Sequence, residues 1–195
     1  MQQHAFLALA MRQSLIRRWA LMRSVSSETV MEHAASCGTI VLLAGMIARE
    51  QGKPVDLERM LAHALVHDMS EVFVSDVVTP VKKASPLLEA EFRRLEAAAD
   101  QQLLDALPAE LRQPMATAFT LEGYEARLFK ACDTYSAWVK AKLEISAGNA
   151  GEFQQAFDTL SASVESAKHE CPELVVLDDW FGGMIGASVD ALMSA

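Results

Sequence analysis

Apolar residues recur every three or four positions along most of the chain, which is the spacing of one face of an α-helix. Ser27 is a plausible N-cap for the first long helix, and Gly52 is a plausible end. The pattern therefore predicts a helix with one buried face between these two residues. Its apolar stripe consists of Val30, Ala34, Cys37, Val41, Ala44 and Ile47.

The same periodicity predicts further helices, and proline-containing segments separate them. Asp56 is expected to cap a helix with the stripe Leu57, Leu61, Ala64 and Leu65. No strand alternation, glycine-rich phosphate loop, repeat or linker is found, so the sequence predicts one all-α domain over residues 1–195. Helices are expected over 87–106, from "LPAEL" (107–111), over 125–147 and over 152–169, with breaks at 75–86, 120–125 and 170–180.

Composition narrows the classes of partner. The chain has 195 residues, of which 51% are hydrophobic, enough for one domain with a substantial core. Its net charge is -9 and its isoelectric point is about 5.0. An acidic protein repels a phosphate backbone, so polymeric DNA or RNA is not expected as a partner. A small anion is compatible with this charge, because a local cation or metal outweighs distant carboxylates.

Cysteine usage and hydropathy bear on the compartment. Cys37, Cys132 and Cys171 are widely spaced, as is typical of free thiols in a reducing compartment. The longest apolar run, "TIVLLAGMIA" (39–48), is shorter than the ~18 residues of a membrane span. The N-terminal residues lack the order of a signal peptide. These features predict a soluble, cytoplasmic protein with no membrane partner.

The segment "HALVHDMSE" (63–71) contains the candidate chemistry. On a helix that turns about 100° per residue, His67 and Asp68 can both reach one ion, whereas His63 lies about 140° from Asp68. His67 is therefore the candidate ligand, and His63 is not expected to bind the ion. Asp68 also extends an apolar row, where a carboxylate is costly unless a cation pairs with it. Glu71 lies one turn further on, where it can relay protons to a metal-bound water.

Each of these residues also has an ordinary structural interpretation. An isolated His-Asp pair is common on helix surfaces, and Ala64 replaces the Glu that a zinc protease motif places after its first histidine. His33 can be a core histidine bonded to a backbone carbonyl, or a ligand. Asp133 can be a surface partner of Lys130, three residues before it, or a ligand. Periodicity alone leaves these alternatives open.

An isolated His, an adjacent His-Asp pair and a distant Asp, all on predicted helices, resemble the H…HD…D signature of the HD-domain metal phosphohydrolases. The resemblance is closer to the bacterial 5′-deoxynucleotidase branch, the YfbR-like family. It spans the first three quarters of the chain. The stretches that carry it are "LIRRWALMR" (15–23), "ETVMEH" (28–33), "HDMSEV" (67–72), "DVVTPVK" (76–82) and "KACDTYSAWVKAKLE" (130–144).

This resemblance implies a single globular HD-domain helical fold and an enzyme that hydrolyses deoxyribonucleoside 5′-monophosphates to deoxynucleoside and phosphate. It further implies one divalent metal held by His33, His67, Asp68 and Asp133. The mixed nitrogen and oxygen donors suit Mn²⁺, Co²⁺, Zn²⁺ or Mg²⁺ without choosing among them. The family resemblance also implies a homodimer.

By the family pattern, Arg18 would hold the phosphate and Trp19 would pack near the sugar and discriminate against a 2′-hydroxyl. Glu71 would handle the proton, and Asp76 would contact the sugar or the reacting water. A planar guanidinium suits phosphate oxygens better than an ammonium does. Without the resemblance, "RRW" (17–19) is typical of a basic turn with a half-buried Trp, and Asp76 is typical of a helix cap or a turn.

The chain departs from the family pattern in two places. Ala34 follows His33, where relatives more often have a residue with a hydroxyl. Ser75 precedes Asp76, where a Gly-Asp pair is more usual, and Ser75, Val77 and Val78 are expected to reshape this loop. These differences bear on the substrate rather than on the metal. The alternatives are an HD phosphohydrolase for another phosphoester, such as a cyclic or signalling nucleotide, and a non-catalytic HD scaffold that binds a nucleotide or partner.

Overall fold

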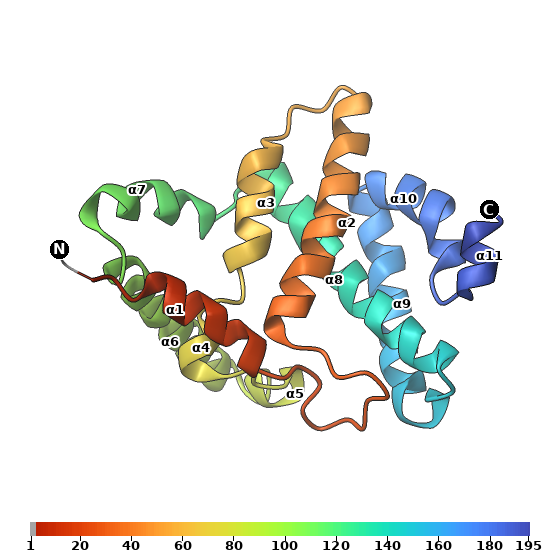
Figure 1. The fold of residues 1–195 in the computed structure, drawn as a ribbon, viewed down its shortest axis with the longest axis horizontal. Helices are drawn as coiled ribbons and strands as arrows, with labels where there is room; N and C mark the ends of the chain where they lie inside the picture. Colours follow the sequence, from red (N-terminus) through yellow and green to blue (C-terminus); the bar gives the residue numbers. More distant parts are fainter. Residues whose placement is uncertain (1–2) are drawn as a thin grey trace. The chain divides into compact units, whose positions relative to one another are not determined.

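The computed structural model describes residues 3–195, and within that range the regular structure is helical, with no β-strand (Figure 1). A lone bridge joins Arg17 to Thr29. The all-α prediction is confirmed. In chain order the elements are α1 (Phe6–Met11), the 3₁₀ helix η1 (Arg12–Leu15), α2 (Val30–Glu50), α3 (Leu57–Val66), α4 (Glu71–Val74), α5 (Thr79–Lys82), α6 (Pro86–Asp105), α7 (Ala109–Ala118), α8 (Gly123–Ser146), α9 (Ala150–Glu170), α10 (Glu173–Phe181), the 3₁₀ helix η2 (Gly182–Met184) and α11 (Val189–Met193).

The contacts divide the described chain into two compact units. The first comprises the residues up to Leu21, Ser27–Ala35 and Glu58–Leu121, and the second comprises Met22–Ser26, Ser36–Leu57 and Glu122–Ala195. Each unit has segments from distant parts of the sequence. That the whole chain folds as one domain over residues 1–195 stays a prediction.

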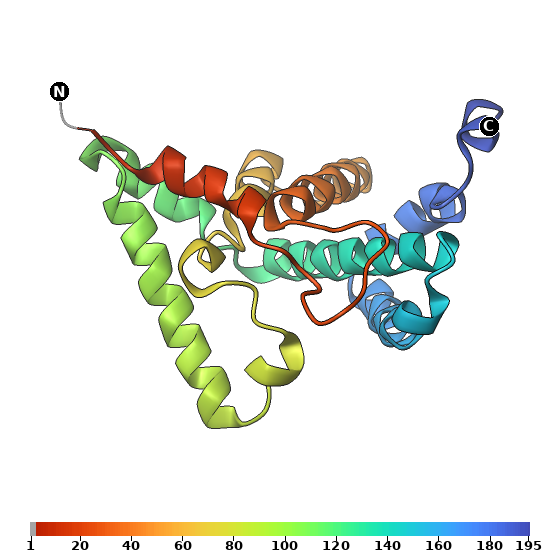
Figure 2. The ribbon, with the colours of Figure 1, turned by 60° about the horizontal axis from the view of Figure 1, so that its bottom comes forward.

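The first unit is organised around α6, which contacts α1, α4, α5 and α7. Figure 2 shows α6 extending from the α5 turn to the start of α7. The core of this unit contains Val66, Met69, Leu103 and Ala118, all buried. The segment that follows α3 is thereby packed into the core on both sides of residues 67 and 68, which fixes the backbone of the His-Asp pair.

Helix α2 confirms the predicted stripe, since all six of its apolar positions are buried. The predicted cap was wrong. The helix begins at Val30, and Thr29 caps it: the Thr29 hydroxyl accepts from the Glu32 N–H at 3.2 Å, while the Glu32 carboxylate accepts from the Thr29 N–H at 2.7 Å. This reciprocal pair is a capping box. It satisfies two backbone donors, whereas a cap at Ser27 would start the helix too early.

Length and composition alone would let α2 cross a membrane. It has 21 residues, and its most apolar window has a mean hydropathy of 1.5. Of that window 44% is buried inside the protein. Core helices pass the same test, and the buried stripe and the capping box are features of a helix that packs against protein.

The second unit is built on the packing of α8 against α9. The Trp138 ring stacks on Phe157 at 5.8 Å between centroids and lies 5.0 Å from the Tyr135 ring. The Trp138 indole N–H donates to the Ser161 hydroxyl at 3.0 Å. Leu174 of α10 is also buried. Apolar contacts with a satisfied indole give this unit its core.

Three further expectations differ from the structure. Leu65 is 60% exposed and Met60 is fully buried, because Leu65 lies about 100° around the helix from the buried Ala64. The segment 75–86 contains one helical turn, α5, with proline in its first turn, where its missing N–H costs nothing. The expected break at 170–180 is confined to Cys171 and Pro172, because α10 starts at Glu173.

Cys37, Cys132 and Cys171 are free, as predicted, and all three are buried.

Candidate metal and phosphate site

The prediction that His67 and Asp68 lie on a helix was wrong, because both residues lie on a tight turn. Helix α3 ends at Val66. The His67 N–H still donates to the His63 carbonyl at 2.8 Å, but the bonds that follow join residues three apart, from Met69 N–H to Val66 O at 2.9 Å and from Glu71 N–H to Asp68 O at 3.1 Å. In such a three-residue turn, successive side chains point about 120° apart. The tips of the two side chains nevertheless approach each other, with His67 Nε2 at 3.2 Å from Asp68 Oδ2.

Three candidate ligands converge in the first unit. His33 Nε2 lies 3.6 Å from Asp68 Oδ2, and His67 Nε2 lies 3.2 Å from the same oxygen. The ligand atoms of His33, His67 and Asp68 all lie within 4.8 Å of one another. His33 is completely buried at the start of α2. The structure therefore brings together residues separated by more than thirty positions in sequence, in an arrangement that can hold a metal ion.

The hydrogen bond of the His67 ring favours a cation between His67 Nε2 and Asp68 Oδ2. Its Nδ1 lies 3.0 Å from the Ala64 carbonyl oxygen, which can only accept a hydrogen bond. The proton of a neutral His67 ring is therefore on Nδ1, and the lone pair of Nε2 faces the Asp68 carboxylate. Two electron-rich atoms at 3.2 Å need a proton or a metal between them. Two imidazoles and a carboxylate are a suitable donor set for a divalent transition metal.

Arg18 connects this cluster to the segment before α2. Its Nη1 donates to Asp68 Oδ2 at 3.0 Å and its Nε donates to Glu28 Oε2 at 3.3 Å. The Trp19 indole N–H donates to the same Glu28 oxygen at 3.0 Å. Glu28 was missed by sequence reasoning, although it begins the stretch "ETVMEH". It holds Arg18 and Trp19 side by side at the edge of the metal-ligand cluster.

The electrostatics keep Asp68 ionised. Burial acts to raise the pKa of Asp68, but the neighbouring His67, Arg18 and His33 outweigh it and hold that pKa well below its usual range. A carboxylate must be deprotonated to bind a metal. Asp68 therefore remains in its ligating form throughout the neutral pH range.

Glu71 is in the opposite state. It is 5% exposed, and burial together with the charges of Asp68 and Asp76 raises its pKa to about 8. Lys82 Nζ lies 3.9 Å from its Oε1. Among the residues that the structure describes, its Oε2 is buried without a hydrogen-bond partner. A carboxyl group with such a pKa can take up or release a proton near neutrality, which suits general acid–base catalysis.

The other predicted residues have separate surroundings. Asp76 is partly buried just after α4, where its charge acts on Glu71. His63 Nδ1 lies 2.8 Å from the Ala118 carbonyl oxygen, and His63 is not one of the three clustered ligands. Asp133 is on α8, in the second unit, where it pairs with Lys130 at 2.8 Å, the surface pairing that the sequence also allowed. Its role as a fourth ligand stays a prediction.

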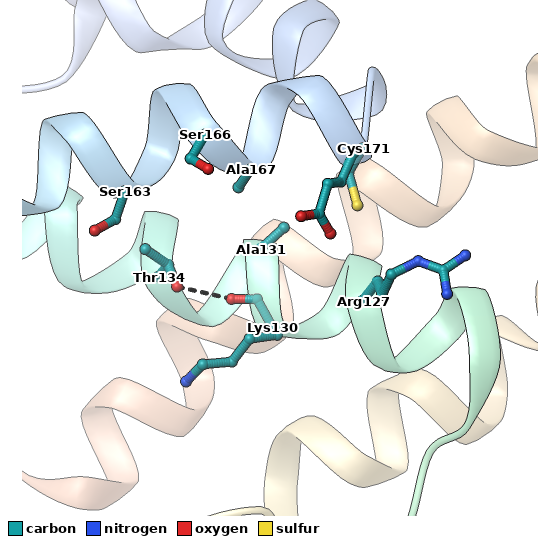
Figure 3. Close-up of a pocket in the computed structure, with 9 residues that line it drawn as sticks. Arg127, Lys130, Ala131, Thr134, Ser163, Ser166, Ala167 and Cys171 are labelled. Atoms are coloured by element: carbon teal, nitrogen blue, oxygen red, sulfur yellow. Dashed lines mark hydrogen bonds between the residues drawn. The ribbon is translucent and has the colours of Figure 1, made fainter. Parts of the chain in front are cut away.

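The second unit has a cavity of about 230 Å³ between α8 and α9, shown in Figure 3. Arg127 and Lys130 supply positive charge to its lining, and Glu170 supplies negative charge. The Thr134 hydroxyl is already committed to the Lys130 carbonyl at 2.9 Å. The mixed charges do not define a ligand class. The cluster of metal donors found among residues 3–195 is instead the one in the first unit.

The helical fold is that of the HD-domain phosphohydrolases. An HD-domain phosphohydrolase from Listeria innocua superposes with a TM-score of 0.80 over 94% of this chain and 89% of its own, at 19% identity. The cyanophage S-2L HD phosphohydrolase DatZ, solved with dA and one catalytic Zn²⁺ ion, gives a TM-score of 0.65 over 91% and 96%, at 23% identity. The predicted fold class is confirmed.

Sequence comparison identifies the family within this class. The sequence model described as 5′-deoxynucleotidase YfbR-like matches residues 5–177. A 5′-deoxynucleotidase of Vibrio vulnificus is 35% identical over 98% of this chain and 100% of its own length. The 5′-deoxynucleotidase YfbR of Escherichia coli is 36% identical over 87% of both chains. The chain belongs to the 5′-deoxynucleotidase YfbR-like family, as its motifs had indicated.

Proposed function

We propose that this protein is a divalent-metal-dependent 5′-deoxynucleotidase, which hydrolyses deoxyribonucleoside 5′-monophosphates to deoxynucleoside and phosphate. Membership of the YfbR-like family supports the reaction class. The convergence of His33 and His67 on one oxygen of Asp68 is the observation that carries the proposal, because it provides a metal site beside an arginine and a proton-transfer acid.

His33, His67 and Asp68 are the proposed metal ligands in the first unit, and Asp133 is proposed as the fourth on the basis of the family pattern. A bound divalent cation would neutralise charge on the phosphate and acidify the attacking water. The donor set accommodates Mn²⁺, Co²⁺, Zn²⁺ or Mg²⁺. Substituting Asp133 by Asn tests its assignment, with metal affinity as the readout.

Arg18 is proposed to bind the phosphate. Its guanidinium lies beside the metal ligands and is held there by Glu28. Phosphate oxygens accept from the same planar donors that now contact carboxylates. Trp19 is proposed to pack against the sugar, since its indole is fixed next to Arg18 by Glu28. Asp76 is proposed to contact the sugar or the reacting water from the loop after α4.

In the proposed reaction the water oxygen forms a bond to phosphorus as the bond between phosphorus and the sugar O5′ breaks. Glu71 takes the proton from the water and passes it to the departing O5′, which gives the deoxynucleoside hydroxyl and returns Glu71 to its ionised form. The raised pKa of Glu71, about 8, supports this role, because an acid–base group works best when its pKa is near the working pH. Arg18 offsets the charge on the phosphate oxygens.

We also propose a cytoplasmic location and a homodimer. The three buried free thiols are consistent with a reducing compartment, and the family resemblance supports the dimer. Light scattering on the purified protein tests the dimer: a mass of twice 21.3 kDa is expected, and the mass of a monomer across the accessible concentration range would remove the dimer.

Phosphate release from the purified protein tests the function. The substrates are dAMP, AMP and cyclic AMP, each with EDTA, without EDTA, and after adding back Mn²⁺, Co²⁺, Zn²⁺ or Mg²⁺. Hydrolysis of dAMP that EDTA abolishes and a metal restores is the expected result. Preference for a cyclic nucleotide would favour the alternative phosphoesterase. Metal and nucleotide binding without turnover of any substrate would favour the non-catalytic scaffold.

A further inference from the structure

Lys82 links the candidate site to α6. It is the last residue of α5, and its Nζ lies 3.0 Å from Glu96 Oε1 and 3.9 Å from Glu71 Oε1. Glu96 belongs to α6, the helix on which the first unit is organised. One ammonium group therefore lies between two carboxylates that come from two different helices, and the α6 carboxylate is the closer of the two.

The surroundings of Glu71 explain why such a cation matters. Its carboxylate is buried, and two other carboxylates, Asp68 and Asp76, act on it. Burial and like charges both oppose an ionised carboxylate. Arg18 also acts on Glu71, but its guanidinium donates to Asp68 and Glu28. Lys82 is the cation whose side chain faces a Glu71 oxygen directly.

Glu71 also lacks the hydrogen bonds that would fix its orientation. Its Oε2 is buried without a hydrogen-bond partner among the described residues, and the contact of Oε1 with Lys82 is longer than a hydrogen bond. Hydrogen bonds therefore leave the carboxylate of Glu71 some freedom of orientation. An ammonium anchored on a rigid helix limits that freedom, since moving Glu71 away from Lys82 separates two opposite charges in a buried place.

We propose that Lys82, anchored by Glu96, is a positioning residue that holds the Glu71 carboxylate in its working orientation. This inference rests on the proposed function, in which Glu71 transfers the proton. Lys82 is assigned to Glu71 and not to the substrate phosphate, because its ammonium lies between the carboxylates of Glu71 and Glu96. The Lys82–Glu96 pair is thus a support for the reacting acid, and its loss slows the chemical step without weakening substrate binding.

Steady-state kinetics with dAMP tests this assignment. K82M, which keeps the length of the chain but removes the charge, is expected to lower kcat about 10- to 100-fold, with KM within about twofold of the wild type. K82R restores the charge and should recover most of kcat. E96Q should lower kcat by a smaller factor, because Lys82 then keeps its charge but loses its anchor.

A double-mutant comparison separates action through Glu71 from general damage. K82M should cause no further loss of kcat in an E71Q background, and E96Q should cause none in a K82M background. The exposed neighbour Lys83 provides the matched control, and K83M should leave kcat and KM unchanged. Mn²⁺ binding measured by calorimetry and the melting temperature should be the same in K82M as in the wild type.

Two kinetic results would overturn the role of Lys82 while leaving the proposed function intact. A K82M enzyme with unchanged kcat would show that Glu71 needs no support, and a raised KM with unchanged kcat would place Lys82 on the phosphate. Full additivity of K82M and E71Q would likewise contradict action through Glu71. An inactive wild-type protein, by contrast, removes the proposed function itself and this inference with it.

Discussion

Glu71 of the first unit and Glu144 of the second unit are both buried, but their pKa values are shifted in opposite directions. Glu144 of α8 is 2% exposed and accepts hydrogen bonds from the Val25 N–H at 2.7 Å, the Ser26 N–H at 3.0 Å and the Asn149 amide at 2.8 Å. Lys140 adds an ion pair. Burial acts to raise the pKa of Glu144, but these donors outweigh it and lower the pKa to about 2.

Glu71 of the first unit has nearly the same burial and almost none of these donors. Its pKa is raised to about 8, because burial and the charges of Asp68 and Asp76 are opposed only by Lys82 and Arg18. Burial alone therefore does not decide the state of a glutamate in this protein. The number of donors does, as expected where desolvation and hydrogen bonding act against each other.

The difference teaches how a structural acid can be distinguished from a reactive one. Glu173 repeats the pattern of Glu144: it is fully buried, and both Tyr124 and Lys53 bond to it. A carboxylate that stabilises a fold is paired with cations or hydrogen-bond donors, because an unpaired buried charge is costly. A carboxyl group that must exchange a proton is left short of donors, and its pKa moves toward neutrality.

The largest effect is expected from removing the carboxylate of Asp68, the proposed metal ligand. D68N should lower kcat/KM for dAMP at least about a thousandfold, equivalent to ~4 kcal/mol, because the cation loses its central ligand. Phosphate release and calorimetric Mn²⁺ titration measure the two consequences. Activity within tenfold of the wild type would show that Asp68 is not a metal ligand.

The second-largest effect is expected from substituting Glu71, which should lower the reaction rate and change how the stability depends on pH. E71Q should lower kcat about 100-fold or more, through loss of proton transfer. A group whose folded pKa is raised destabilises the folded state increasingly as pH rises from its unfolded value of 4.5 to about 8. The melting temperature of E71Q relative to wild type, measured in EDTA, should therefore increase over this range. A difference in melting temperature that stays constant or falls as pH rises would contradict the raised pKa of Glu71.

The matched change at Glu144 should act on stability and leave chemistry alone. E144Q should lose about 3 kcal/mol of unfolding free energy at pH 7, because it breaks a buried ion pair. A group with a depressed folded pKa contributes stability above its unfolded pKa, and this contribution is lost as pH falls toward about 2. Urea unfolding should show the gap to wild type closing below pH 4.5. A pH-independent gap would mean that packing, not charge, stabilises Glu144.

The smallest effect is expected at His63. H63Q should leave kcat/KM and Mn²⁺ affinity within about twofold of wild type, because His63 bonds to the Ala118 carbonyl and is not among the clustered ligands. Its amide can keep that hydrogen bond. A tenfold loss of metal affinity would place His63 in the metal site, against both the helical geometry and the observed contacts.

Helical periodicity predicted the long elements because they satisfy it many times over. The six stripe residues of α2 are all buried, and the Thr29–Glu32 capping box could have been read from the sequence as Thr-x-x-Glu. One-turn elements such as α5 are too short to show a period. Leu65 was wrongly placed in the core, because the width of the buried face depends on tertiary neighbours rather than on the helix itself.

The clustering of the three candidate ligands could also be predicted, because His33, His67 and Asp68 belong to the motif on which the family resemblance rests. The residues around them could not. Glu28, Lys82 and Glu96 act through side-chain contacts between separate segments, and an isolated Glu or Lys in a sequence usually marks a solvated surface. Their contacts follow from the fold and not from the spacing of residues in the sequence.

Trp19 and Ser75 share a backbone feature that ties the site to the rest of the molecule. Among residues 3–195 they are the non-glycine residues with positive φ, at +60° and +64°, in a region that side chains usually avoid. One follows Arg18 and the other precedes Asp76. Such conformations cost about 1–3 kcal/mol each and persist only when surrounding contacts enforce them. The backbone on either side of the candidate site is therefore strained at these two positions, and the packing around it has to hold that strain.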